Sequence, residues 1–581
     1  MTPRGRGDVF GEHVALIARR GRLLSAEPVF ERGPAVGLDR GGRVREMEGR
    51  LALVRFAGGR AKVLREVGRP DVARDVSAAL LWERLGWRGF RAKLEAAADE
   101  AVDAARRSGP RRRDLTELPT FTVDPATARD FDDAVSARRE EGGIRVWIHI
   151  ADVAAHVTPG SELDREAAER ANSTYVPGAV EPMLPRALSA DACSLVPGVE
   201  RFAVTTEIEF AESGEPRSAG FYRSLIRSDH RLDYDQLDEI FAGRESAPGH
   251  VAEPLEIARE VAAALGERRG QGALAVDSRE PEFVFDDDGH VTGARGVPQT
   301  EAHRLIEHLM VCTNEQVAAL LEQRRIPAPY RVHEQPDPPR IERLFEQLAS
   351  LDLPTPPLPE RIGPSEAGKL AGEASRLVAA EAARRGYGRS AYTSLVLRAL
   401  KQAHYSDRNL GHAGLASPAY CHFTSPIRRY PDLVAHRGLL AAVGEGEDEP
   451  SRDTVREAAM NCSERERESS RLERDADDIC AAFLLERELF EHGWEASFAG
   501  EVSGVIGAGA FVAFGGELGD VYEGFLPART LRGERFDLDE PETALVGGRT
   551  GRKVRLGDPV SVNVTRVDAH RGRVDLEPAD G

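Results

Sequence analysis

The sequence predicts a multidomain α+β protein, with a mixed α/β central unit flanked by small β-barrels. Its 581 residues exceed what one hydrophobic core organises, and typical domain sizes suggest roughly three to five units. Patterns with a period of two residues, typical of strands, and patterns with a period near 3.6, typical of helices, occupy separate stretches of the chain. Hydrophobic residues make up 41% and charged residues 30%, which is typical of globular domains.

The first part of the chain, residues 1–110, is rich in arginine and glycine. Two strands are predicted there, Leu51–Phe56 and Ala61–Val67, and a helical stretch follows over Val76–Ala105. The run Ser108-Gly-Pro-Arg-Arg-Arg113 then indicates a linker. Because only two strands are predicted here, we expect at most one complete barrel in this region.

A central mixed α/β unit is expected over residues 111–494. Ile144, Val146, Ile148 and Ile150 alternate with other residue types, which predicts a half-buried strand, and Thr205–Phe210 repeats the pattern. Further on, apolar residues recur at helical spacing. They predict one helix over residues 392–403 and a long helix from about 456 to 491.

Residues 495–581 return to strand patterns. Four short strands are predicted, beginning at Phe498, Gly509, Val521 and Pro559, with glycine-containing turns between them. Short strands of this number and spacing favour a small closed barrel of the OB type.

Composition excludes several classes of protein. No run approaches the roughly 20 apolar residues of a membrane helix, and the first residues lack the apolar core of a signal peptide, so a cytoplasmic protein without membrane contact is expected. The net charge of −19 argues against a generally basic surface, so a nucleic-acid ligand would need a local patch or an internal channel. Zinc and disulfides are not expected, because the five cysteines form no C-x-x-C pair.

Four aspartates within ten residues carry the densest chemistry in the chain: Asp124, Asp130, Asp132 and Asp133. Carboxylates this close repel one another unless a cation lies among them, and a site made only of oxygen ligands suits Mg²⁺ or Mn²⁺. The alternative is a solvated acidic loop. An EF-hand is disfavoured, since its glycine and distal glutamate are missing.

Two neighbours favour the metal site over the solvated loop. Pro125 favours a bend after Asp124, and Phe131 is expected to hold the acidic segment toward the interior. A magnesium cluster of this kind is what phosphodiester hydrolysis requires.

The spacing D-x5-D-x-D-D, followed by a strand ending Ile148-His-Ile-Ala-Asp-Val, resembles the catalytic domain of the ribonuclease II and ribonuclease R family, the RNB domain. Further motifs match in the same order: Gly160-Ser-Glu-Leu-Asp-Arg-Glu-Ala, Pro182-Met-Leu-Pro-Arg-Ala-Leu-Ser, Cys193-Ser-Leu, Tyr392–Ala416 and Phe423–Arg437. The resemblance implies a processive, hydrolytic exoribonuclease that degrades single-stranded RNA from its 3′ end to nucleoside 5′-monophosphates.

The resemblance also implies roles for the aspartates. All four match acidic positions of the family. Asp124 and Asp133 are expected as principal metal ligands, Asp130 completes the set, and Asp132 is expected to be the most important carboxylate for activity. Mg²⁺ is the implied cofactor, with Mn²⁺ as a substitute.

Three further residues match functional positions of the family. Arg428 matches the catalytic arginine, whose guanidinium can bind two phosphate oxygens; the alternative is a structural ion pair. Tyr234 matches an aromatic residue that stacks on a terminal base, and the alternative is a core tyrosine. Glu473 matches a glutamate that contacts the terminal ribose. At a second clamping position relatives carry phenylalanine, whereas this chain has Val276, so the length of the final product is left open.

The flanking regions resemble RNA-binding barrels: residues 495–581 an S1-type domain, and residues 1–110 a reduced cold-shock-type barrel. In the S1-type region Phe511 is expected to stack on RNA while Phe514 lies in the core. His149, His412 and His436 are expected to be structural. The expected partner is single-stranded RNA, the protein is expected to be a monomer, and no protein partner is indicated.

Two other classes of protein are alternatives to a nuclease. A non-catalytic RNA-binding protein on a degenerate nuclease scaffold is disfavoured, because the four aspartates and Arg428 are all present. A structural cation-binding module does not explain the distant segment that carries Arg428. Digestion of duplex RNA is left open, since the chain lacks the N-terminal helical extension and lysine-rich tail that relatives often carry.

Overall fold

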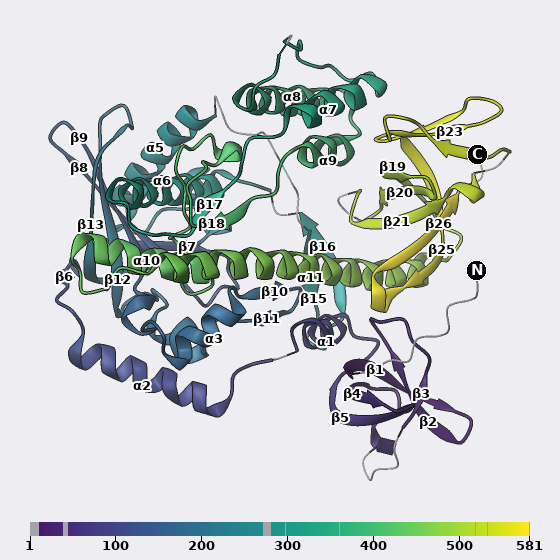
Figure 1. The fold of residues 1–581 in the computed structure, drawn as a ribbon, viewed down its shortest axis with the longest axis horizontal. Helices are drawn as coiled ribbons and strands as arrows, with labels where there is room; N and C mark the ends of the chain where they lie inside the picture. Colours follow the sequence, from purple (N-terminus) through teal and green to yellow (C-terminus); the bar gives the residue numbers. More distant parts are fainter. Residues whose placement is uncertain are drawn as a thin grey trace.

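The computed structural model describes residues 11–38, 44–86, 88–270, 281–296, 298–359, 361–516, 519–531 and 533–579. Figure 1 shows a barrel near the N-terminus, a central α/β unit, a separate group of helices and a second barrel near the C-terminus. The helix α11 (Arg452–His492) runs along the molecule. It packs against the central unit and against both the N-terminal and the C-terminal regions of the chain.

The N-terminal barrel consists of five strands: β1 (Gly11–Arg20), β2 (Leu23–Pro28), β3 (Val36–Gly37), β4 (Leu51–Ala57) and β5 (Arg60–Gly68). Their order is β3-β2-β1-β4-β5, and a bridge between Leu38 and Ala61 joins the two edges. The two strands predicted from the sequence correspond to β4 and β5. Its interior is filled by small and β-branched residues such as Ala15, Ile17 and Val54.

The predicted helical stretch Val76–Ala105 is two helices, α1 (Ala73–Leu85) and α2 (Ala92–Ser108). Gly86 ends α1 with a φ of 74°, and Gly89 follows with a φ of 66°. These left-handed conformations suit glycine and break a helix. Because α2 packs against the central unit, the boundary predicted near residue 110 stays a prediction, as does the boundary near residue 494.

The central unit is built on a seven-stranded sheet in the order β14-β7-β8-β9-β12-β13-β6. Its strands are β6 (Arg113–Asp114), β7 (Phe121–Asp124), β8 (Asp133–Glu140), β9 (Gly143–Ala151), β12 (Glu200–Phe210), β13 (Pro216–Arg227) and β14 (His230–Asp233). The five strands from β7 to β13 are antiparallel, while β14 and β6 add in parallel at the edges. Helices cover the sheet, with α5 packed on β8 and α6 on β9.

Helices and hairpins surround this sheet. The helices are α3 (Glu162–Arg170), α4 (Tyr234–Phe241), α5 (Ala252–Arg269), α6 (Glu301–Arg324) and α10 (Tyr430–Val443). Three two-stranded sheets pair β10 (Thr174–Val176) with β11 (Ala179–Glu181), β15 (Pro281–Phe285) with β16 (Val291–Gly296), and β17 (Tyr330–Val332) with β18 (His404–Ser406). Single helical turns are η1 (Val44–Met47), η2 (Val153–Ala155), η3 (Ala187–Ala192), η4 (Ala413–Leu415), η5 (Ala528–Thr530) and η6 (Ala569–Arg571).

The strand predicted around Ile144–Ile150 exists as β9, but the prediction that it is half-buried is wrong. Trp147 and His149 alternate with the isoleucines and are nevertheless buried. The reason is that β9 lies between β8 and β12 in the middle of the sheet, where both faces are covered. His149 is fully buried, and its two ring nitrogens lie 3.1 Å from the Ser136 hydroxyl and 2.8 Å from the Thr205 hydroxyl.

Burial of His149 predicts a pH-dependent stability. Burial lowers its pKa to about 3, whereas the unfolded chain binds a proton near pH 6.5. The unfolded state therefore binds more protons between these values, and the free energy of unfolding falls as the pH drops below about 6.5, by about 1.4 kcal/mol per pH unit. His149→Gln removes this term, so in urea unfolding the difference between wild type and variant should change at this slope between pH 6 and 4. A difference that is independent of pH would contradict the prediction.

A helical unit connects the centre to the C-terminal barrel. It contains α7 (Pro338–Ser350), α8 (Pro364–Arg385) and α9 (Arg389–Ala399), which share a core of their own. The predicted helix over residues 392–403 ends earlier, because Leu400 is already extended. In this unit Ser350 meets Thr543 of the C-terminal region through a 2.7 Å hydroxyl contact.

The C-terminal barrel closes through β19 (Ser497–Ile506), β20 (Gly509–Phe514), β21 (Tyr522–Pro527), β26 (Arg573–Pro578) and β25 (Pro559–Asp568). The closed barrel predicted for this region is confirmed, and the four predicted strands correspond to β19, β20, β21 and β25. A three-stranded sheet of β22 (Phe536–Leu538), β23 (Ala544–Gly547) and β24 (Lys553–Arg555) is inserted before β25.

The two barrels touch through η6. The His570 Nε2 atom lies 2.6 Å from the Pro70 carbonyl, and Arg571 donates to the Pro28 carbonyl at 3.3 Å. Figure 1 shows both barrels at the same end of α11. Among the described residues, no helix has the length and apolar character needed to cross a membrane.

Candidate active site

The four aspartates lie where β7 ends and β8 begins. Asp124 is the last residue of β7 and Asp133 is the first residue of β8. These strands are neighbours in the sheet, so the loop between them must return to the edge from which it left. The loop therefore keeps Asp130 and Asp132 beside the strand ends.

Several contacts hold this loop. Phe131 is buried, its amide donates to the Ser194 hydroxyl at 3.0 Å, and its carbonyl accepts from Leu195. Arg231 donates to the Pro125 carbonyl at 2.9 Å and covers the Phe131 ring. The bend at Pro125 closes with a hydrogen bond from Ala128 to the Pro125 carbonyl. The structure thus supports the inward orientation expected from Phe131.

Burial makes this cluster electrostatically unfavourable as it stands. The Oδ2 atoms of Asp124, Asp132 and Asp133 are buried without a hydrogen-bond partner. Burial, followed by repulsion from Asp133 and Asp132, raises the pKa of Asp124 to about 8. Burial also raises the pKa of Asp133 to about 6 and that of Asp132 well above its usual range. Buried carboxylate oxygens without donors are costly, and a bound cation would remove that cost.

The donor set fits a divalent metal in its chemistry. The orphaned oxygens are hard ligands of the kind that Mg²⁺ and Mn²⁺ prefer. In the part of the chain that the structure describes, no three His, Cys, Asp or Glu side chains converge closely enough to hold a metal ion as they stand. The aspartates are therefore candidate ligands because of their proximity and their unpaired oxygens, not because they form a finished cage.

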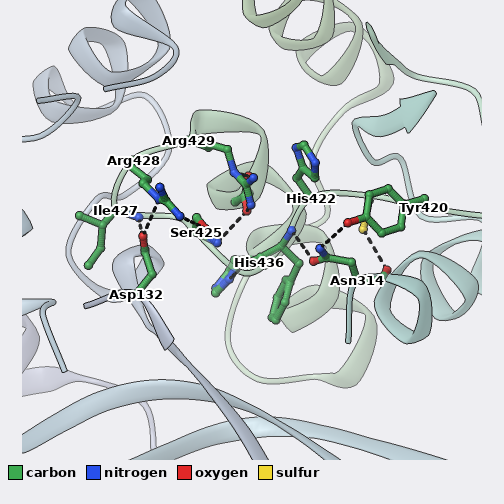
Figure 2. A network of polar contacts seen from close by, with 12 residues as sticks. Asp132, Asn314, Tyr420, His422, Ser425, Ile427, Arg428, Arg429 and His436 are labelled. Carbon is green, nitrogen blue, oxygen red and sulfur yellow. Dashed lines mark hydrogen bonds and ion pairs between the residues drawn. The ribbon is translucent and has the colours of Figure 1, made fainter. Parts of the chain in front are cut away.

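Asp132 connects this cluster to a segment almost 300 residues further along the chain. Its Oδ1 atom accepts a 2.9 Å hydrogen bond from the Ile427 amide, and its Oδ2 atom lies 3.4 Å from Nε of Arg428. Figure 2 shows both contacts. Asp132 is 3% exposed, whereas the Arg428 side chain is 49% exposed. The arginine thus stands between a buried carboxylate and open space.

The backbone around Arg428 is fixed from both sides. The Ser173 amide donates to the Arg428 carbonyl at 2.9 Å, and the Tyr430 amide donates to the Ala171 carbonyl at 2.8 Å. Ala171 has a φ of 63°, which is rare for a residue with a side chain. This turn brings the loop before β10 against the arginine segment.

Arg429 has a different environment from Arg428. It pairs with Asp432 through two hydrogen bonds of 2.9 and 2.7 Å, and Asp432 also accepts from the Ser425 amide. In the same segment the His436 Nε2 atom lies 2.8 Å from the Phe423 carbonyl. Arg429 therefore supports the loop, while Arg428 faces the cluster.

A cavity of about 240 Å³ opens beside Arg428. Glu473 of α11 lines it, together with Arg429, Glu466 and Tyr175. The structure thus brings Glu473 to the same cavity as Arg428, and its contact with a terminal ribose stays a prediction.

Tyr175 is a site residue that sequence reasoning missed. Its hydroxyl donates to Oδ2 of Asp130 at 3.2 Å, and its backbone amide donates to Oε1 of Glu473 at 3.3 Å. Tyr175 is 37% exposed. The only signal in the sequence is an aromatic residue before a Pro-Gly turn, between two matched motifs, which does not distinguish it from a core tyrosine.

Tyr234 follows β14, the strand next to β7 in the sheet. It is the first residue of α4, directly after Asp233, which pairs in register with Asp124 across β14 and β7. Burial and then the charges of Asp133 and Asp124 raise the pKa of Tyr234. One face of the ring stacks on His303, with centroids 3.9 Å apart.

One predicted RNA contact lies elsewhere in the structure. Phe511 is on β20 in the C-terminal barrel, away from the sheet that carries the aspartates (Figure 1). Its partly exposed ring lies 5.3 Å from that of Phe525, whereas Phe514 is buried. The two phenylalanines thus face opposite sides, as expected. Val276 lies outside the described residues.

Fold and site together define a multidomain α+β protein whose central sheet carries a buried acidic centre next to an arginine. Residues 112–445 match the family model described as the RNB domain, and the chain belongs to this family. A similar curated protein is Ribonuclease R of Aquifex aeolicus, 38% identical over 481 residues, which cover 80% of this chain and 65% of that protein. The chain spans 56–65% of the length of the first curated relatives that it matches.

Solved structures show the same fold. Mycoplasma genitalium RNase R in complex with ribose methylated single-stranded RNA is 24% identical, with a TM-score of 0.86 over 98% of this chain and 90% of that one. Yeast Ssd1, described as a pseudonuclease, is 17% identical with a TM-score of 0.65 over 92% of this chain and 68% of that one. The fold therefore occurs in proteins with and without nuclease activity. Whether this chain is a nuclease has to be inferred from the residues of the site, because the fold alone does not establish it.

Proposed function

We propose that this protein is a metal-dependent, hydrolytic exoribonuclease that degrades single-stranded RNA processively from its 3′ end to nucleoside 5′-monophosphates. The observation that carries the proposal is the buried aspartate cluster, with three orphaned oxygens, next to the half-exposed Arg428. Membership of the RNB family and similarity to proteins of the Ribonuclease R family, a metal-dependent nuclease family, support it. The predicted cytoplasmic location and monomeric state stay predictions.

The metal would be held by Asp124, Asp130, Asp132 and Asp133, and we propose Mg²⁺, with Mn²⁺ as a substitute. When bound, such ions generate a hydroxide nucleophile and stabilise the leaving oxygen of a phosphodiester. The chain's own part is to hold the carboxylates in place. The backbone hydrogen bonds of Phe131 with Ser194 and Leu195 serve that purpose, as does the hydrogen bond from Arg231 to the Pro125 carbonyl.

Arg428 would bind the phosphate that is cut. Its contacts with Asp132 and the Ser425 hydroxyl are both 3.4 Å, longer than a strong charge-assisted hydrogen bond. The guanidinium can therefore turn toward a phosphate at little cost. There it would neutralise the charge that develops in the transition state.

The RNA end would lie between Arg428 and the aromatic residues near it. Tyr175 and Glu473 line the cavity beside Arg428, and there they would contact the terminal nucleotide. Tyr234, near Asp124 and Asp133, would stack on a base, and Phe511 of the C-terminal barrel would contact RNA further from its end.

The rival function is RNA binding without catalysis on the same fold. The likeness to a pseudonuclease gives this alternative weight at the level of fold alone. Retention of all four aspartates and Arg428 favours catalysis. The orphaned oxygens favour it further, because burying unpaired carboxylates is costly unless they serve a bound cation.

One experiment tests the proposal. Single-stranded RNA and a duplex with a 3′ overhang, each labelled at the 5′ end, are incubated with the protein in Mg²⁺, with and without a chelator. Conversion of full-length RNA to a short 5′-labelled end product is expected, with any intermediates differing by one nucleotide, and the chelator should abolish it. Internal fragments, or intact RNA under all conditions, would refute it.

Tyr234→Ala should change the length of the final product. Loss of one base stack weakens the hold on a short RNA by roughly 1–3 kcal/mol, so short intermediates should dissociate earlier and accumulate. A high-resolution gel of end products measures this, and Tyr234→Phe, which keeps the ring, serves as the control. An unchanged pattern with Tyr234→Ala would exclude the stacking role.

A further inference from the structure

We propose that His303 is a positioning residue that fixes Tyr234 in one orientation and leaves a single face of its ring for a nucleobase. The inference rests on the proposed function, which it deepens. It starts from the stack between the two rings, whose planes are inclined by 12° and whose centroids are 3.9 Å apart. This is close, nearly parallel contact over the ring faces, so His303 occupies one face of Tyr234.

The helices that carry the two rings are fixed to each other. Asp238 lies one turn after Tyr234 on α4, hence on the same side of that helix. Its Oδ1 atom accepts a 3.2 Å hydrogen bond from the Ala302 amide in the first turn of α6. The carboxylate thus satisfies one of the open amides at the start of α6. His303 is the next residue, so its position relative to Tyr234 is set by this contact.

The ring of His303 is also held at its edge. Thr300 occupies the N-cap position of α6, where a threonine hydroxyl commonly accepts from a backbone amide of the first turn. Here it makes no such cap. Instead its hydroxyl lies 2.8 Å from Nδ1 of His303. The hydroxyl holds the imidazole in place, while Asp238 from α4 does the capping.

The backbone at Tyr234 is also fixed, because Tyr234 is the first residue of α4. Asp233, the N-cap residue of α4, forms a capping box with Gln236. Asp233 also pairs with Asp124 across the sheet edge. The tyrosine is therefore held between the aspartate cluster and His303, and a base can stack only on the face away from the imidazole. A stack fixed in this way sets a definite distance between the last held base and the aspartates.

The first test measures the stack without requiring cleavage. In an Asp132→Asn background, single-stranded oligonucleotides with 2-aminopurine at each of the last four positions report stacking through fluorescence quenching. His303→Ala should reduce quenching at the position that Tyr234→Ala also affects, and weaken binding about two- to tenfold, as expected for one aromatic pair. His303→Phe keeps an aromatic platform and should restore both. Unchanged quenching with His303→Ala, or equal loss with His303→Phe, overturns the proposal.

The second test uses the active protein. His303→Ala should shift the final product length in the direction seen with Tyr234→Ala, while His303→Phe should not. His308→Ala is the matched control, because His308 is on the same helix but faces Gly266 of α5. A shift with His308→Ala of the same size would mean that α6 is merely disturbed and would overturn the proposal. If the wild type cuts no RNA, the proposed function fails, whereas the fluorescence test still decides the role of His303.

Discussion

Asp132→Asn is expected to lower the turnover of single-stranded RNA by roughly three orders of magnitude or more while leaving RNA binding largely intact. Asparagine can still accept the hydrogen bond from the Ile427 amide that Oδ1 accepts now. Asparagine lacks the negative charge of the carboxylate. In Asp132 the Oδ2 atom faces Arg428 and has no hydrogen-bond partner. The substitution thus keeps the connection between the two segments and removes the charge. An interaction of this kind acts in the transition state more than in substrate binding.

Single-turnover cleavage and equilibrium binding, measured on the same labelled RNA, separate the two effects. A loss of binding as large as the loss of turnover would refute the assignment of Asp132. Stability provides the control. Burial raises the pKa of Asp132, which means that its charged form disfavours the folded state near neutral pH. Without added metal the asparagine variant should therefore melt no lower than the wild type.

The sequence predicted those parts of the fold in which one pattern dominates over a long stretch. Helix α11 and strand β20 lie where periodicity placed them, because each has a continuous apolar side. The strands β1–β3 were not predicted. β1 is exposed at both ends and carries charged residues, and β3 has two residues, so neither presents a clear alternation. The burial of His149 was missed because it depends on helices packed from elsewhere in the chain.

In the candidate site, too, some residues could be predicted from the sequence and others could not. The spacing of the four aspartates in the sequence was enough to predict that they form a cluster, since they lie within one loop between neighbouring strands. Arg428 required a family resemblance, because nothing in the local sequence connects it with Asp132. Tyr175 and His303 could not be predicted, since their roles depend on contacts with Asp130, Glu473 and Tyr234. These contacts join residues that are 45 or more positions apart in the chain.

Arg428→Ala should also cause a large loss of turnover, of roughly 10²–10³-fold, because it removes the cation placed to neutralise the phosphate in the transition state. Arg428→Lys should recover only part of the activity, since lysine supplies a charge but not two parallel donors. The free energy of unfolding should change little, because the side chain is half exposed and its contacts are long.

Arg429 provides the matched control for this prediction. Its two short hydrogen bonds reach Asp432, which is fully buried. Removing one partner of a buried pair leaves an uncompensated charge and typically costs about 3–5 kcal/mol. Arg429→Ala should therefore lower the melting temperature strongly, whereas Arg428→Ala should lower kcat in a protein that remains folded. If Arg428→Ala destabilises the protein as much as Arg429→Ala does, Arg428 is a structural ion-pair partner of Asp132 and not the group that binds the phosphate.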